Sequence, residues 1–289
     1  MKARLTPGGG LRRTALRGIY LVPDLTDEWT PLVLATAPSA LLAVSGQVAA
    51  AIYGWDGFDR LAASIRAKPD LVTPWTRRPS LVPYRQLGLR PEDLRVVDGI
   101  RVAPPMWTLG EISQIKGLKS DRLEQAVECA LRRKHVTEDE LWAWAAAHPE
   151  GALLAEVLAL RGRGTPPTGS LLETLALQRV LRFHAIEVVG RQVDVFENGE
   201  FVCRQDFLLD GWTFFEVDGS QHDRPSHRDS DRKRDLKLKG YGLEVARASR
   251  QEVAEDGILA ARLRRVVQQG CKAHVGEPVP LDHNTIHVG

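Results

Sequence analysis

Two mostly apolar, strand-like segments of this chain end in acidic residues, a pattern typical of a metal-dependent hydrolytic site. The segment 212–218 carries Glu216 and Asp218 among aromatic and aliphatic residues. Apolar strands seldom contain a charge unless a partner or a cation offsets the lost hydration. Because side chains alternate along a strand, Trp212, Phe214 and both acids share one face. Alternatively, the two acids form surface ion pairs at a strand end and have no catalytic role.

A third acid, Asp206, lies in the preceding strand-like segment 201–209. The Asp-Gly pair at 210–211 is a strong hairpin signal, so the two segments are expected to pair. A two-residue loop would place Asp206 opposite Phe215, on the face away from the other acids. A three-residue loop would place it opposite Phe214, beside the second acid. The catalytic hypothesis therefore requires the longer loop, or a bulge.

Three clustered carboxylates, Asp206, Glu216 and Asp218, suit Mg²⁺ or Mn²⁺, which prefer hard oxygen ligands and leave room for phosphate oxygens. Such an ion polarises a phosphoryl group and lowers the pKa of the attacking water. His222 follows closely, and its ordinary pKa near neutrality suits a general base or a leaving-group acid. These residue types predict a site that hydrolyses phosphodiester bonds.

Glu173 is a further candidate, with two alternative roles. Ser170 and Glu173 have the S-x-x-E spacing of a capping box, in which the glutamate binds a backbone N–H at the start of a helix. The alternative is a catalytic role for the same glutamate, which a family resemblance of the C-terminal part implies. Capping is the preferred interpretation.

A segment of mixed charge, 227–239, follows the acidic cluster and is expected to form a helix that ends at Gly240. Its basic side chains are candidates for contacts with nucleic-acid phosphates, or else form a solvated helix face. The nucleic-acid candidates are Arg228, Arg232, Lys233 and Arg234.

The C-terminal part resembles the Vsr-like (very-short-patch-repair-like) branch of the PD-(D/E)XK endonuclease superfamily over about residues 168–267. The matching segments are Asp206-Phe207, Glu216-Val217-Asp218-Gly219, His222, the run 231–236, Gly240 and the strand 242–247. The resemblance implies a restriction-endonuclease-like α/β (α+β) domain: a mixed four-stranded sheet flanked by helices. It also implies that Asp206 and Glu216 are metal ligands and that Glu173 occupies the place of an acid from the first helix. Asp218 replaces the lysine that the superfamily places two residues after the second acid, and the Vsr-like branch uses a histidine instead, which assigns that role to His222.

The N-terminal part is expected to be mostly helical with short strands. It resembles the AbiEi-type antitoxin regulators in Arg17-Gly18-Ile19-Tyr20, in the run 44–54 and in the run 99–108. These regulators begin with a winged helix-turn-helix. Sixteen residues precede Arg17 here, too few for the helices that normally enter a DNA groove, so no N-terminal residue is assigned to DNA contact.

Turn-forming residues place the domain boundary at 161–169. The predicted organisation is an AbiEi-like region over 1–160 (a partial winged helix and a helical part), a linker, a nuclease-like domain over 170–270 and a flexible tail over 271–289.

Composition favours a globular enzyme or binding protein without a membrane span. The chain has 289 residues, 43% of them hydrophobic, and a net charge of +2, so contact with DNA must come from local patches. Three cysteines far apart in the sequence predict neither disulfides nor a zinc motif and fit a reducing cytoplasm.

Two functions remain open. The preferred one is an Mg²⁺-dependent DNA endonuclease or nickase acting in repair, defence or mobile-element control. The alternative is a non-catalytic, DNA-binding transcriptional regulator of the AbiEi antitoxin type, for which a partner toxin is conceivable.

Overall fold

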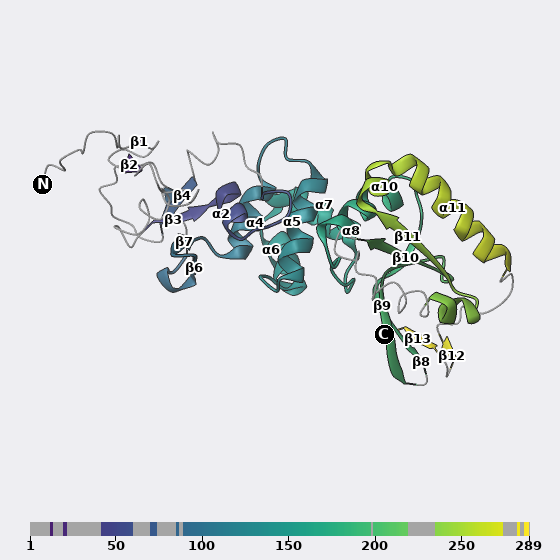
Figure 1. Cartoon of the computed structure of the whole chain (residues 1–289). Helices are drawn as coiled ribbons and strands as arrows, with labels where there is room; N and C mark the ends of the chain where they lie inside the picture. The colour runs from purple at the N-terminus through teal and green to yellow at the C-terminus, as the bar shows by residue number, and fades with distance from the viewer. Residues whose placement is uncertain are drawn as a thin grey trace, which may run out of the picture. The chain divides into compact units, whose positions relative to one another are not determined.

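The structure is a computed structural model with a mixed α/β architecture (Figure 1). It describes residues 42–59, 89–197, 199–218 and 235–273, the side chain of Leu71, and the backbone of short strands at 12–13, 20–21, 70–73, 85–86, 282–283 and 286–288. The α/β class expected from the sequence is therefore correct at this level.

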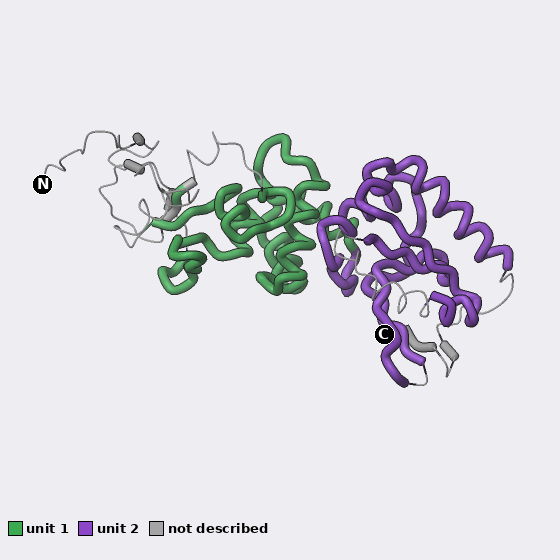
Figure 2. The backbone as a smooth tube through the Cα atoms, in the orientation of Figure 1, with its two compact units in different colours: residues 1–161 green, residues 162–289 purple. Residues whose placement is uncertain are grey.

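The chain forms two compact units, residues 1–161 and residues 162–289 (Figure 2). The division between Arg161 and Gly162 falls at the start of the turn-rich segment in which the sequence places the boundary. Arg161 is the last residue of the first unit and is bound to it, since its buried guanidinium contacts Glu128 at 3.2 Å and Glu138 at 3.0 Å.

Unit 1 combines a five-stranded sheet, in the order β5-β4-β3-β7-β6, with several helices. Its strands are β1 (Arg12–Arg13), β2 (Tyr20–Leu21), β3 (Ala43–Ser45), β4 (Asp70–Thr73), β5 (Arg85–Gln86), β6 (Arg95–Val97) and β7 (Ile100–Val102). Its helices are α2 (Gly46–Ile52), η1 (Pro91–Asp93), α4 (Pro105–Ser113), α5 (Ser120–Arg132), α6 (Glu138–Ala147), η2 (Pro149–Gly151) and α7 (Ala152–Arg161).

Local sequence signals explain how these helices begin and pack. Thr137 caps α6. The Glu140 carboxylate accepts a hydrogen bond from the Thr137 backbone N–H at 2.7 Å, which completes a capping box. One hydrophobic core joins α2, α4, α5 and α7 around fully buried side chains such as Trp55, Phe58 and Leu123. Unit 1 thus has a core made entirely of its own residues.

Unit 2 is built on a six-stranded sheet in the order β11-β10-β9-β8-β13-β12. Its strands are β8 (Val188–Glu197), β9 (Glu200–Leu209), β10 (Thr213–Asp218), β11 (Glu244–Ser249), β12 (Asp282–His283) and β13 (Ile286–Val288). Its helices are α8 (Leu171–Ala176), which continues into the π-helical turn η3 (Leu177–Arg182), an unlabelled helix at 235–240, α10 (Arg250–Ala254) and α11 (Asp256–Ala273). Strand β10 is parallel to β11, and the other neighbours are antiparallel.

Four of these strands, β8 to β11, form a mixed sheet as expected. Two short strands extend it, because β13 pairs with the outer edge of β8 and β12 pairs with β13. In the segment 271–289, for which a flexible tail is expected, α11 continues to Ala273 and the backbone of β12 and β13 is described. The sequence reading rested on scattered prolines and histidines, which say nothing about an available sheet edge.

The sheet of unit 2 is covered on both faces. Phe207, Phe215 and Val217 pack with α8, η3, α10 and α11 on one face. Phe214 and Trp212 pack on the other with Leu238 and Leu243, which lie on or after the helix at 235–240. This alternation confirms the predicted strand periodicity of 212–218. Glu216 and Asp218 lie at the carboxyl end of β10.

Among the described helices, none combines the length and the apolar character that a bilayer span needs.

Candidate functional site

The β9–β10 hairpin fixes the position of the first predicted acid. Its register pairs Leu209 with Thr213, which leaves a three-residue loop of Asp210, Gly211 and Trp212. Asp210 and Gly211 both have a positive φ, +55° and +91°, and aspartate and glycine are among the residues that tolerate this region. The longer loop that the catalytic hypothesis requires is therefore present.

The register differs from the expected one in detail. Phe214 pairs with Leu208 and Phe215 with Phe207, so one step further along both strands Asp206 lies opposite Glu216, not opposite Phe214. The backbone N–H of Val217 donates to Oδ2 of Asp206 at 2.8 Å. This bond holds the Asp206 carboxylate at the end of β10, next to the second and third acids.

Strand β8 is distorted at the same level of the sheet. Arg191 pairs with Phe207 and Val193 with Gln205, so Gln192 lies opposite Asp206. Gln192 has a φ of +49°, a conformation that costs a non-glycine residue energy and that is concentrated at functional sites.

The distortion coincides with a change of side-chain face along β9. Cys203 packs in the same cluster as Phe214, whereas Phe207 packs in the cluster of Phe215. Regular alternation would place Cys203 and Phe207 on one face. The strand therefore loses its regular alternation at the level of Asp206.

Glu173 reaches this position from α8 and is 7% exposed. Oγ of Ser170 accepts from the Glu173 backbone N–H at 3.2 Å, as expected for a helix N-cap. The reciprocal bond differs from a capping box, because the Glu173 carboxylate accepts from the N–H of Gly169 at 2.6 Å and from Nε2 of Gln192 at 2.8 Å. Glu173 thus joins the helix start to the distorted part of β8.

The electrostatics of Asp206 reveal the crowding of acids. Burial first, and then the charges of Glu173, Glu216 and Asp218, raise its pKa to about 7 against the opposing effect of the Val217 N–H. Carboxylates that share a site disfavour one another's ionisation unless a cation balances them. The four acids therefore form one electrostatic cluster, called the acidic cluster below.

Arg247 is a cation that contacts this cluster. It lies across from Glu216 in the parallel β10–β11 pair and donates from Nε to the Glu216 carboxylate at 2.7 Å. Its two terminal nitrogens bind both oxygens of Asp235 at 2.5 and 2.9 Å. Arg247 consequently ties the second acid to the helix at 235–240.

Five predicted site residues lie outside the described residues: His222, Arg228, Arg232, Lys233 and Arg234. The structure brings together the four others, Glu173, Asp206, Glu216 and Asp218, as judged by the shared effect on the pKa of Asp206.

The donor set of the acidic cluster fits a hard divalent cation. It offers carboxylate oxygens only, and the pKa of Asp206 is raised by burial and by the charges of the three neighbouring acids. Within the described part of the chain, no three His, Cys, Asp or Glu side chains are already arranged to hold a metal ion. Binding would therefore require the acids to turn away from their present partners, chiefly Glu216 from Arg247.

Sequence reasoning missed Gln192 and Arg247. Arg247 carried a signal, because it is a charged residue at the centre of a short strand of small and apolar residues, where a partner is expected. Gln192 carried none, since its role depends on a backbone conformation that glutamine rarely adopts.

Comparison of the chain with protein-family models, with curated proteins and with solved structures finds no match.

Proposed function

We propose that unit 2 is a metal-dependent nuclease domain of the PD-(D/E)XK type, closest in pattern to the Vsr-like branch, which hydrolyses phosphodiester bonds of DNA. The observation that carries the proposal is the position of Asp206. It lies opposite Glu216 and its pKa is raised to about 7 by burial and by three neighbouring acids. A half-buried cluster of like charges is unfavourable by itself, and such perturbed groups are concentrated at functional sites.

The order of elements supports the same proposal. A helix (α8) precedes three antiparallel strands (β8, β9 and β10), and then a helix at 235–240 leads to the parallel strand β11. This arrangement is compatible with the mixed sheet and flanking helices that the sequence resemblance implies. The two added strands extend the sheet at the edge away from β10.

Asp206, Glu216 and Asp218 would hold Mg²⁺ or Mn²⁺. When bound, such an ion supplies charge stabilisation at the phosphoryl group and a lower pKa for the attacking water. Gln192 holds the Glu173 carboxylate, which contributes negative charge to the cluster from α8.

His222 is assigned proton transfer, either from the attacking water or to the leaving oxygen, because its residue type suits both. Arg228, Arg232, Lys233 and Arg234 are proposed to contact DNA phosphates. These assignments rest on the sequence.

Plasmid cleavage tests the proposal. Purified protein should nick or cut supercoiled plasmid with Mg²⁺ or Mn²⁺ and not with EDTA, and Asp206→Asn or Glu216→Gln should lower the rate at least a hundredfold. Asp194→Asn is the matched control, because Asp194 is an acid of the same sheet that pairs with Arg204 at 2.6 Å and contacts none of the acidic cluster's residues in the pairs described. Equal rates for all variants would refute the assignment of the site.

The regulator alternative makes the opposite prediction. Sequence-specific binding to promoter DNA that survives Asp206→Asn and Glu216→Gln, without any cleavage, would favour a non-catalytic AbiEi-type regulator, in which case a partner toxin becomes the next object of search.

A further inference from the structure

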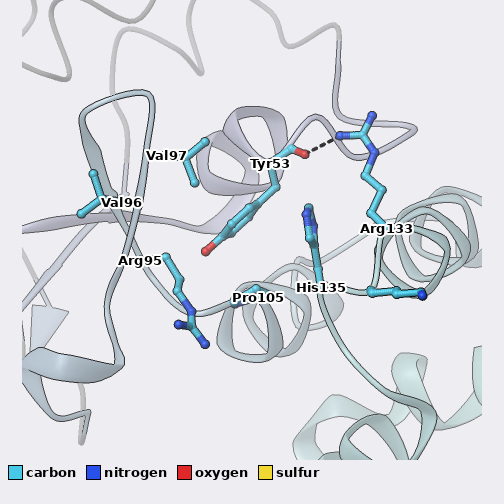
Figure 3. A pocket seen from close by; sticks show the side chains of 8 residues that line it. Tyr53, Arg95, Val96, Val97, Pro105, Arg133 and His135 are labelled. Carbon is cyan, nitrogen blue, oxygen red and sulfur yellow. Dashed lines mark hydrogen bonds between the residues drawn. The ribbon is translucent and has the colours of Figure 1, made fainter.

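A basic pocket in unit 1 is separate from the acidic cluster, both in sequence and in the core that supports it. Its volume is about 370 Å³, within the range of about 300 to 1,000 Å³ typical of small-molecule sites. Its lining comprises Tyr53, Arg95, Val96, Val97, Pro105, Arg133, Lys134 and His135 (Figure 3). None of these residues is acidic.

Two helix ends and one strand edge form the pocket. Tyr53 ends α2, and Gly54 and Trp55 close that end with bonds to Ala51 and Ala50 at 2.9 and 3.0 Å. Lys134 and His135 close α5 in the same way, with bonds to Leu131 and Ala130, both at 2.9 Å. These are the paired bonds of the Schellman motif, so the backbone carbonyls at this point are already satisfied.

The backbone at Lys134 is unusual for such a helix end. Lys134 has a φ of +56°, at the position where glycine is strongly favoured because other residues are strained there. At the equivalent position of α2 the chain has Gly54, with a φ of +66°. The chain therefore keeps a cationic side chain beside the pocket at an energetic cost that glycine would avoid.

Three of the lining side chains, Arg95, Arg133 and Lys134, carry a positive charge. They differ in the contacts that they make within the protein. Arg133 donates from Nη1 to the carbonyl oxygen of Tyr53 at 2.9 Å (Figure 3). The helix dipole of α5 accounts for basic residues at its C-terminus, but Arg95 comes from β6 at the edge of the sheet. The Arg95 side chain makes no hydrogen bond or ion pair with the described residues, and its nearby acid, Asp93, is bound by Arg90 at 3.0 Å.

His135 adds a neutral hydrogen-bond donor. Its Nδ1 accepts from Nε1 of Trp55 at 2.9 Å, so the proton of the neutral ring lies on Nε2. Burial, assisted by Arg133, lowers the pKa of His135, which keeps the ring neutral at physiological pH.

The remaining lining residues are Tyr53, Val96, Val97 and Pro105, which are largely apolar. The Tyr53 ring stacks on Trp55 with centroids 5.1 Å apart and an interplanar angle of 17°, and its hydroxyl donates to the Ala103 carbonyl at 2.7 Å. Val97 and Pro105, both half-buried, complete this side of the pocket (Figure 3). An apolar aromatic wall beside several cations is suited to a planar ligand that carries an anionic group.

We propose that this pocket binds a nucleotide, with its phosphate on Arg95, Arg133 and Lys134 and its base against Tyr53, Val97 and Pro105. Guanidinium groups bind phosphate oxygens through paired hydrogen bonds, and aromatic side chains accept bases of any sequence. The nucleotide is either free or part of a nucleic-acid strand, since both present the same base and phosphate.

Calorimetric titration of the full chain in EDTA tests the proposal, with the 5′-monophosphate of deoxyadenosine, deoxyadenosine itself and inorganic phosphate as three separate probes. The monophosphate should bind, and each of the other two should bind at least tenfold more weakly, because each lacks one half of the ligand. A single-stranded oligonucleotide that binds more tightly than the monophosphate identifies a strand as the source, and one that binds equally or less tightly identifies the free nucleotide.

Three variants locate the site. Arg95→Glu should weaken binding of the monophosphate at least tenfold, while Lys116→Glu, the same charge change at another exposed position of unit 1, should leave the affinity within twofold. Lys134→Gly should weaken binding several-fold while it raises the melting temperature, since glycine relieves the backbone at this position. Loss of binding in that variant is therefore not a loss of fold.

The inference does not depend on nuclease activity, so Glu216→Gln should bind the monophosphate with unchanged affinity. Absence of binding up to millimolar monophosphate, equal binding of inorganic phosphate, or binding that is indifferent to both Arg95→Glu and Lys134→Gly would overturn it.

Discussion

Asp206 is the residue on which the chemistry of unit 2 depends, and its raised pKa has a consequence for stability. A carboxyl group whose pKa is higher in the folded than in the unfolded protein keeps its proton when the unfolded chain has lost it. The contribution of Asp206 to the free energy of unfolding therefore falls as the pH rises from about 4, the ordinary pKa of aspartate, to about 7, its pKa in the folded protein. Above this range the folded protein without a cation carries the full cost of the ionised group.

Asp206→Asn should remove this loss. In EDTA, the unfolding free energy of the variant minus that of the original protein should be about 1 to 2 kcal/mol larger at pH 8 than at pH 5. The asparagine amide oxygen still accepts from the Val217 N–H, so the change isolates the charge. Denaturant melts at the two pH values measure the difference, and a gain that is identical at both would show that Asp206 is not the titrating group.

Arg247 has a second kind of influence, because it neutralises Glu216 in the absence of a cation. Arg247→Met leaves Glu216 and Asp235, whose side chains are 13% and 22% exposed, without this partner. We expect a loss of about 2 to 4 kcal/mol in EDTA, as for other ion pairs broken on one side, and partial recovery with Mn²⁺.

The matched control is Arg204→Met, since Arg204 forms an equally close pair with Asp194 but is 56% exposed. Exposed pairs contribute at most about 1 kcal/mol. If urea melts show equal losses of stability for the two variants, the contacts of Arg247 contribute no more than an exposed ion pair does.

At the scale of elements, the β9–β10 hairpin decides whether the acids meet. Oδ1 of Asp210 accepts from the backbone N–H groups of Trp212 and Thr213 at 3.0 and 2.9 Å. Asp210→Ala removes both bonds at a position of positive φ and should cost about 1 to 2 kcal/mol. Asp210→Asn keeps the acceptor and tolerates the same φ, so it should stay within about 0.5 kcal/mol of the original in thermal melts. Equal losses in the two variants would mean that the turn does not depend on this acceptor.

The sequence predicted this hairpin only in part. Alternation of aromatic residues in 212–218 and the Asp-Gly pair were sufficient for two paired strands with both acids of β10 on one face. The expected partner of Asp206 was wrong by two residues although the loop has the expected three, because pairing of Leu209 with Thr213 already places Asp206 opposite Glu216 and not opposite Phe214. Strands β12 and β13 were missed since their pairing with β8 depends on a distant edge, not on local propensity.

At the scale of the whole molecule, the two units have cores without shared residues, so damage to one should leave the other intact. Gly110 of α4 offers a test in unit 1, because a Cβ there would lie 2.4 Å from the Trp144 ring. That ring is held between His148 and Trp107, at centroid distances of 3.8 and 4.9 Å. Gly110→Ala should therefore cost about 1 to 3 kcal/mol through overpacking.

Hydrogen exchange followed by mass spectrometry locates that loss. Peptides from α4 and α6 should exchange faster in Gly110→Ala, and peptides from β9 and β10 should be unchanged. Faster exchange throughout both units would show that the chain unfolds as a single cooperative structure.

The central claim is that the acidic cluster of unit 2 holds a divalent cation, and a Mn²⁺ titration followed by the electron paramagnetic resonance signal of the free ion tests it most directly. The account predicts saturable uptake of Mn²⁺ at pH 8 that Asp206→Asn and Glu216→Gln each weaken at least tenfold and that Asp194→Asn leaves unchanged. No uptake by the original protein, or uptake that persists in the double variant of Asp206 and Glu216, would contradict it.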